Sequence, residues 1–349
     1  MSLPIIIGHH DALLRLEQED ELEPFLYGND WTNLDLPRSQ GAGVCASFFA
    51  CWVPQPSVSL DDLVEDFGEQ TDEIVLDDPI DPEYARDFVN SMMLRLHELA
   101  EASEGELSVV HDISELRACR EEGRQGAILH FEGAEPISGD PELLEYYYSW
   151  GLRSLGLVWS RSNEFGTGVP FWFPSSPDTG PGLSEAGLEL VRECNRLGIM
   201  LDLSHLNEEG FWDVVRTSIR PLVATHSNAH ALCPSARNLT DEQLEAIRQS
   251  NGIVGVNFCT SDLRDDGQDE EDTDVALVLE QIDYLVETMG IEHVGLGTDY
   301  DGAVVPSALS DVTALPGLIE ALAERGYDQE ELAKLTFLNW ERVLEETWQ

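Results

Sequence analysis

Short apolar runs bounded by turn residues recur along the whole chain. Continuous apolar runs of this length are typical of parallel strands that are buried on both faces. Between the runs, apolar residues recur with a helical period; the segment 82–102, for example, places Phe88, Met92 and Leu96 on one stripe. The runs predict eight strands, at 5–9, 43–53, 126–132, 152–159, 198–205, 221–226, 252–258 and 293–299.

Strand and helix therefore alternate from one end of the chain to the other. Further helices are predicted over 184–197, 240–250 and 275–289, and Thr240 is a suitable N-cap for the second of these. Eight β/α units in succession are the signature of a single (β/α)₈ TIM-type barrel. We expect one α/β domain over 1–349, folded as a single barrel.

Three segments between or after the predicted strands have distinct compositions. The segment 306–349 is expected to supply helices that close the barrel. The stretch 166–182 is rich in Gly, Pro and aromatic residues and predicts a long loop after the fourth strand, where loops of barrels commonly cover the active site. The stretch 261–274 is strongly acidic, and we expect it to be a solvated surface loop.

The charge balance excludes several classes of partner. The 349 residues include 68 acidic and 19 basic side chains, which gives a formal net charge of −49. A nucleic-acid binder needs a basic face, and attraction to an anionic membrane needs basic clusters, so neither partner is expected. The acidic residues are spread over the whole chain, which indicates adaptation to a salt-rich (halophilic) cytoplasm. An acidic patch for one cationic partner is the alternative.

The location expected from the sequence is the cytoplasm. The first residues lack the basic and apolar regions of a signal peptide. The sequence also contains no run of about 18 apolar residues, which is the length that predicts a membrane span. The six cysteines occur singly, without a C-x-x-C pair, and we expect them to be reduced.

Polar residues that suit metal chemistry end most of the predicted strands. The active site of a (β/α)₈ barrel lies at the C-terminal ends of its strands. Imidazoles and carboxylates that converge there from different strands provide the nitrogen and oxygen ligands of one or two divalent ions. The residues delivered to this end are His9, Asp11, Glu132, Trp159, His205, His226, Asn257, Asp299 and Asp301.

These residues divide into two sets of metal ligands. His9 and Asp11 are two apart, so they face the same side and can reach one metal, with His10 turned away. His205 and His226 end neighbouring strands and can share a second metal, and Glu132 lies between the two sets. His130 shares the face of Glu132, which suits a supporting position behind the ligands.

Seven motifs of the chain resemble the membrane (renal) dipeptidase family of zinc peptidases, in the family's order and over essentially the whole length. The motifs are GHHDAL at 8–13, LDLPRSQGAGV at 34–44, LHFEGAEPI at 129–137, LDLSHL at 201–206, THSNAHALCPSARNLTDEQ at 225–243, HVGLGTDYDG at 293–302 and FLNWERVLEE at 337–346.

The resemblance implies that 1–349 form one catalytic (β/α)₈ barrel of the metal-dependent hydrolase type, which holds two zinc ions and hydrolyses dipeptides. It assigns His9 and Asp11 to one zinc and His205 and His226 to the other, with Glu132 bridging both. It further implies a homodimer. Some family members are secreted and lipid-anchored, and they carry a signal peptide and an anchor sequence that are not expected here. The resemblance is therefore applied to the catalytic domain only.

The resemblance also assigns the residues that handle the substrate. Asp299 matches the family acid that holds the substrate amino group and moves a proton, and Arg237 matches the arginine that grips the substrate carboxylate. Trp159 is a departure, because well-known members carry a histidine beside the scissile carbonyl at this position. Trp cannot donate at the same place or take up a proton, so the substrate profile is expected to differ.

The mechanism expected from these residues is hydrolysis by water activated between two metals, with Asp299 moving the proton to the leaving amine. Other readings remain open. A different amidohydrolase-like barrel would act on a cyclic amide, a lactone or a deaminable base, none of which offers a carboxylate to Arg237. A non-enzymatic barrel would keep its metals for structure only, and a phosphate-binding barrel would need glycine and lysine in the last loops.

Overall fold

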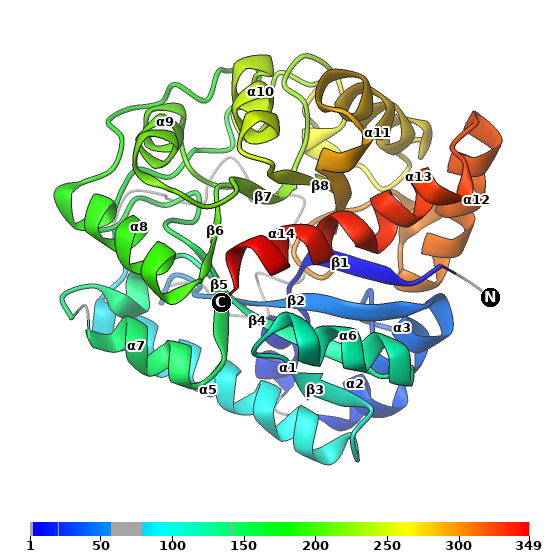
Figure 1. Ribbon diagram of the computed structural model, residues 1–349, viewed down its shortest axis with the longest axis horizontal. Helices are drawn as coiled ribbons and strands as arrows, with labels where there is room; N and C mark the ends of the chain where they lie inside the picture. The colour runs from blue at the N-terminus through cyan, green and yellow to red at the C-terminus, as the bar shows by residue number, and fades with distance from the viewer. Residues whose placement is uncertain (1–2, 20, 57–78, 141, 349) are drawn as a thin grey trace.

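Eight parallel strands close into a barrel that helices surround (Figure 1), and this architecture confirms the predicted (β/α)₈ fold. The computed structural model describes residues 3–19, 21–56, 79–140 and 142–348. Pairing of β2 with β4 closes the ring. Around it, in order, stand β1 (Ile5–His10), β2 (Val44–Trp52), β4 (Gln125–Glu132), β5 (Leu152–Gly156), β6 (Met200–Asp202), β7 (Val223–Ser227), β8 (Ile253–Asn257) and β9 (Val294–Thr298).

A ninth strand, β3 (Leu107–Val109), was not among the eight expected from the sequence. It pairs with the first half of β4, from Leu107 opposite Gln125 to Val109 opposite Ala127. Three residues are too short for an apolar run to stand out from its surroundings. The strand extends the sheet outside the ring and does not change the order of strands within the barrel.

The helices lie outside the strands and mostly begin at side-chain caps. Thr240 caps its helix as predicted, because its hydroxyl accepts from the amide of Gln243 while the Gln243 side chain returns to the amide of Thr240. The helices are α1 (Ala12–Glu19), α2 (Glu23–Tyr27), α3 (Leu36–Ala42), α5 (Pro82–Ala102), α6 (Ile113–Glu122), α7 (Glu142–Ser149), α8 (Glu185–Leu197), α9 (Glu208–Thr217), α10 (Asp241–Gln249), α11 (Ala276–Met289), α12 (Leu315–Arg325), α13 (Gln329–Ala333) and α14 (Asn339–Thr347).

The C-terminal helix α14 covers the end of the barrel where the strands begin, and it crosses the ring of strands in Figure 1. Its Trp340 is fully buried and joins a cluster with residues from the early parts of the strands, such as Ile6, Val223 and Ile253. A Cβ atom at Gly8 would lie 2.5 Å from the Trp340 ring. Because glycine has no side chain, the Trp340 indole fits against the backbone at Gly8. The N-terminal end of the barrel is therefore filled by side chains, which leaves the opposite end for a functional site.

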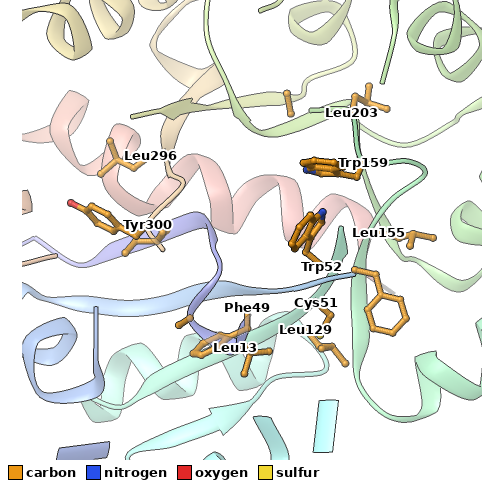
Figure 2. Packing of buried hydrophobic residues seen from close by; sticks show 14 of the residues in the cluster. Leu13, Phe49, Cys51, Trp52, Leu129, Leu155, Trp159, Leu203, Leu296 and Tyr300 are labelled. Atoms are coloured by element: carbon orange, nitrogen blue, oxygen red, sulfur yellow. The ribbon is translucent and has the colours of Figure 1, made fainter. Parts of the chain in front are cut away.

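A second apolar layer fills the space between the barrel and its helices, and it continues to the C-terminal ends of the strands (Figure 2). There Trp52, the last residue of β2, stands opposite Glu132, the last residue of β4. The Trp52 ring lies 5.1 Å from the ring of Trp159 in the segment after β5. Aromatic side chains therefore border the polar end of the barrel.

The long loop over 166–182 crosses this end of the barrel as expected. Its backbone binds the segment after β6, where the amide of Val169 donates to the carbonyl of His205 (2.8 Å). It also binds the segment after β7, where the amide of Ala236 donates to the carbonyl of Trp172 (3.0 Å). The loop thus connects the neighbours of His205 with those of Arg237.

The acidic stretch 261–274 is only partly solvated, which corrects the expectation of a surface loop. Most of its carboxylates are exposed, but Asp262 is buried. The Ser235 hydroxyl donates to Asp262 (2.7 Å) and accepts from the amide of Arg237 (3.2 Å). Through Ser235, Asp262 therefore stabilises the segment that carries Arg237. This contact keeps the Asp262 side chain out of solvent.

Candidate metal centre

Five side chains from four strands converge at the C-terminal end of the barrel. β1 delivers His9, and Asp11 follows that strand directly. Glu132 ends β4, His226 lies in β7, and His205 comes three residues after the end of β6. All five are buried. The polar ends of separate strands thus meet in one place, as the sequence pattern requires.

Glu132 lies between the two sets of residues. Its Oε1 is 3.8 Å from Nε2 of His9, 2.8 Å from Nε2 of His205 and 3.6 Å from Nε2 of His226. The Nε2 atoms of His205 and His226 are 3.0 Å apart, and Nε2 of His9 is 3.2 Å from Oδ2 of Asp11. The ligand atoms of His9, Asp11 and Glu132, and those of Glu132, His205 and His226, form two groups tight enough to hold an ion each.

Hydroxyl groups behind the two imidazoles orient them. The Thr225 hydroxyl donates to Asp202 Oδ2 (2.5 Å) and lies 2.8 Å from Nδ1 of His226, so it accepts an Nδ1–H there. The Ser160 hydroxyl lies 2.8 Å from Nδ1 of His205. Partners at Nδ1 leave the Nε2 lone pair for a metal, and such contacts behind the ligands fix the ring.

The electrostatics suit cations. Burial and the nearby positive charges of Arg237 and His9 lower the pKa of His205 and His226 well below the ordinary histidine value, so both imidazoles are neutral and can ligate. Burial lowers the pKa of His9 as well, but Glu132 and Asp11 outweigh it and raise that pKa to about 10. Burial raises the pKa of Glu132. The carboxylates that hold a proton on His9 would equally attract a divalent ion, so the donor set fits metals.

Asp299 follows β9 and faces the same centre. Its Oδ1 is 3.9 Å from Nε2 of His9, and Asn257 donates to its Oδ2 (3.0 Å). Burial and the charge of Asp11 raise the pKa of Asp299 to about 6, against the lowering effect of His9. Its backbone is left-handed, with φ of 63°. Asp299 also groups with His9 and His226 tightly enough to hold an ion, so a ligand role competes with a proton-transfer role.

Arg237 is buried beside the two imidazoles. Its guanidinium donates to the carbonyl of Ser204 and to the carbonyl of His226 (3.1 Å). Nη2 lies 3.4 Å from Nε2 of His205. The backbone of the strand ends therefore holds a fixed planar cation at the edge of the metal centre, a geometry that suits a carboxylate.

Trp159 lies next to the same imidazole. Its ring is 5.8 Å from the ring of His205 and 5.5 Å from the ring of Phe171 in the long loop. An indole here provides an apolar surface at the position where the resemblance implies a histidine. The structure thus brings Trp159, Arg237, Asp299 and the five ligand candidates to one end of the barrel.

Asp202 is a supporting residue that was not assigned from the sequence. Asp202 ends β6 and binds Ser204 and Thr225, which places it behind His226. Its place at the C-terminal end of a strand was the signal for it. His130, expected as a support, lies 2.9 Å from the Ser154 hydroxyl and 3.6 Å from Asp202. His10 points away from the centre toward the Ser47 hydroxyl (3.0 Å).

A (β/α)₈ barrel whose strand ends collect imidazoles, carboxylates and a fixed arginine defines a metal-dependent hydrolase of small substrates. Comparison with known proteins identifies the family. The model of the membrane dipeptidase family (peptidase family M19) matches residues 1–349, and the chain belongs to that family. It is therefore a dipeptidase of the metallopeptidase class, as the sequence motifs predicted.

Relatives and solved structures agree with this assignment. The chain is 30% identical to an uncharacterized dipeptidase of Schizosaccharomyces pombe, over 98% of this chain and 80% of the relative. It is 46% identical to a metallopeptidase from Rhodobacter sphaeroides whose structure holds a phosphinate mimic of the dipeptide L-Ala-D-Ala. The TM-score is 0.93, and the match covers 100% of both chains. The probable dipeptidase PvdM from Pseudomonas aeruginosa shares the fold, with a TM-score of 0.84 at 20% identity over 99% of this chain and 95% of that one.

Proposed function

We propose that the enzyme hydrolyses dipeptides with two divalent ions, which are most readily zinc. His9 and Asp11 would hold one ion, His205 and His226 the other, and Glu132 would bridge them. The observation that carries this proposal is the position of Glu132 Oε1, within 3.8 Å of the Nε2 atoms of all three histidines. Divalent ions at these positions supply Lewis acidity, which polarises a carbonyl and lowers the pKa of water to about 7.

The side chains around the ligands perform the remaining steps. Asp299 holds the substrate amino group, accepts a proton from the attacking water and returns it to the departing amine. Arg237 binds the free carboxylate through its planar fork and sets the length of the substrate to two residues. Trp159 contacts the substrate beside His205. These roles place the amino end near His9 and the carboxyl end near His205.

The experiment that tests this function is turnover of a dipeptide panel in concentrated KCl. The Rhodobacter structure makes L-Ala-D-Ala the first substrate to include. We expect hydrolysis of free dipeptides, and no turnover of cyclic amides, lactones or nucleobases. Turnover confined to one of those other classes would contradict the proposal and favour a different amidohydrolase-like activity.

We propose that the whole chain forms one catalytic domain and acts in a salt-rich cytoplasm. All six cysteines lie within the described part of the chain and are unpaired, which suits a reducing compartment. Among the described residues, no helix has both the length and the apolar character needed to cross a membrane. A homodimer stays a prediction, and light scattering in concentrated salt measures it.

Folding and activity are expected to need high salt. A formal charge of −49 repels itself, and the Debye length falls from about 30 Å at 0.01 M salt to about 3 Å at 1 M. Circular dichroism during dialysis from molar to millimolar KCl checks this. We expect the thermal midpoint to fall and native signal to be lost at low salt; an unchanged midpoint would contradict it.

A further inference from the structure

Three aromatic side chains form one wall beside the metal centre, which we call the aromatic wall: Trp52, Trp159 and Phe171. Trp159 lies between the other two, with ring centroids 5.1 Å from Trp52 and 5.5 Å from Phe171. Figure 2 shows the two indoles next to each other, and their planes are inclined by 63°. Trp52 and Trp159 are almost fully buried and Phe171 is partly exposed, so the wall has an accessible part at its Phe171 side.

The wall adjoins the carboxylate end of the proposed substrate. The rings of Trp159 and Phe171 lie 5.8 Å and 6.5 Å from the ring of His205. Arg237 approaches the same imidazole, with Nη2 3.4 Å from Nε2. Asp299, which would hold the amino group, lies instead 3.9 Å from His9. The side chain nearest the wall is therefore that of the C-terminal residue of the dipeptide.

A buried ion pair lies behind the wall. Arg161 is 1% exposed, and its Nη2 donates to the carbonyl of Val53 (3.0 Å) and to Oε1 of Glu135 (3.4 Å). Glu135 is itself 2% exposed. Val53 follows β2, Glu135 follows β4 and Arg161 follows β5, so this pair connects three loops at the C-terminal end of the barrel.

The indole of Trp159 is part of the environment of this buried cation. The guanidinium carbon lies 5.5 Å from the centroid of the Trp159 ring, within the range of a cation–π contact. Within the described chain, Nε and Nη1 of Arg161 are buried without a hydrogen-bond partner. Burial accordingly lowers the pKa of Arg161 and raises that of Glu135, although each opposes the shift of the other. A desolvated cation is costly unless neighbours compensate it, and here the neighbours are Glu135, the carbonyl of Val53 and the Trp159 ring.

We propose that Arg161 is a positioning residue, which with Glu135 fixes the Trp159 indole so that the aromatic wall receives an apolar side chain of the substrate's C-terminal residue. The inference rests on the proposed dipeptidase function. It names dipeptides with a large apolar second residue as the preferred substrate class, and it explains why an arginine is buried two residues after Trp159.

A spectroscopic measurement tests the positioning without turnover. The indoles of Trp52 and Trp159, with centroids 5.1 Å apart and planes inclined by 63°, are expected to give an exciton couplet in far-UV circular dichroism. The spectrum of Trp52→Phe shows how much of the couplet comes from Trp52 and Trp159, because this variant lacks one of the two indoles. We expect Arg161→Met to lose the same fraction of the couplet, because Arg161 no longer holds the Trp159 indole in place. Arg161→Lys should recover some of it, since lysine keeps the charge beside Glu135 but lacks the planar fork. A couplet retained in Arg161→Met would overturn the proposal.

The kinetic test compares dipeptides whose second residue is leucine or glycine. In the wild type we expect kcat/KM to favour leucine by about 10-fold or more, since burial of a leucine side chain is worth about 1.5–3 kcal/mol. In Arg161→Met this preference should fall by about 5- to 10-fold, mostly through KM, because an indole that is no longer fixed buries less of the leucine side chain. An unchanged preference would overturn the proposal.

Arg153, at the start of β5, provides a matched control. It is also buried, its guanidinium carbon lies 3.9 Å from the centroid of the Tyr148 ring, and it donates to three backbone carbonyls. It lies, however, at the end of the strand opposite to the aromatic wall. Arg153→Met should lower stability and leave the leucine preference and the couplet unchanged.

The double variant Arg161→Met/Glu135→Gln removes both charges, so it tests the position of Trp159 without an unpaired buried carboxylate, and it should behave as Arg161→Met does. A wild type inactive on every dipeptide would contradict the proposed function, whereas the couplet would still decide the role of Arg161.

Discussion

Replacement of Asp299 by asparagine is expected to lower kcat by about 10²- to 10⁴-fold, the typical contribution of a positioned general acid–base group. Asparagine retains the shape and accepts the hydrogen bond from Asn257, but it cannot take up a proton. It also tolerates the left-handed backbone at this position, where φ is 63°. Steady-state kinetics and metal analysis of the same sample measure the effect, and the metal content should stay at the wild-type value.

Asp301 offers the matched control for this variant. It is also buried and left-handed, with φ of 64°, and its pKa is also raised to about 6 by burial. Its Oδ1, however, accepts from the amide of Asn33 (2.8 Å), so it supports a loop. Asp301→Asn should therefore keep most of the activity. Near-normal kcat in Asp299→Asn would remove Asp299 from proton transfer, and loss of an ion would make it a ligand instead.

The second large effect concerns the free carboxylate of the substrate. Arg237→Met should lower kcat/KM for a free dipeptide by about 10- to 100-fold, because a hydrogen bond to a charged group contributes about 1.5–3 kcal/mol. The wild type should cleave a free dipeptide far better than the same dipeptide with its C-terminal carboxyl amidated. This preference should collapse in Arg237→Met, since only the charged substrate loses its partner. Kinetics on the two substrates give the ratio directly.

Arg237→Lys separates charge from geometry. Lysine keeps the positive charge but loses the planar fork, so its kcat/KM should fall between those of the wild type and Arg237→Met. Equal losses on the free and the amidated dipeptide would show that Arg237 supports the strand ends and does not bind the carboxylate. That result would favour a substrate without a carboxylate, such as a cyclic amide or lactone.

The sequence predicts the barrel and the meeting place of the polar residues because both follow from local patterns. Apolar runs specify the strands, and a polar residue at the end of a run must lie at the C-terminal mouth once the barrel is known. His9, Glu132, His205 and His226 could be placed together for this reason. The strand β3 could not be found, because three residues paired at the edge of β4 carry no periodic signal.

Supporting residues are harder to predict because their partners are distant in sequence. Asp262 lies in an acidic stretch that suggests solvent, and only the fold shows that it receives the hydroxyl of Ser235. Arg161 is equally ordinary in the sequence, yet it is buried between Glu135 and Trp159 from separate loops. Contacts among loops depend on the directions in which side chains point at the C-terminal end of the barrel. The hydrophobic periodicity of the sequence does not indicate these directions.

The metal content of active enzyme purified in concentrated KCl tests the two-metal site most directly. With two groups of ligand atoms that share Glu132, we expect about two divalent ions per chain, as in a two-metal hydrolytic site. A chelator should abolish activity, and zinc should restore it. Full activity with one ion per chain or none would contradict the bridging role of Glu132 and the two-metal mechanism.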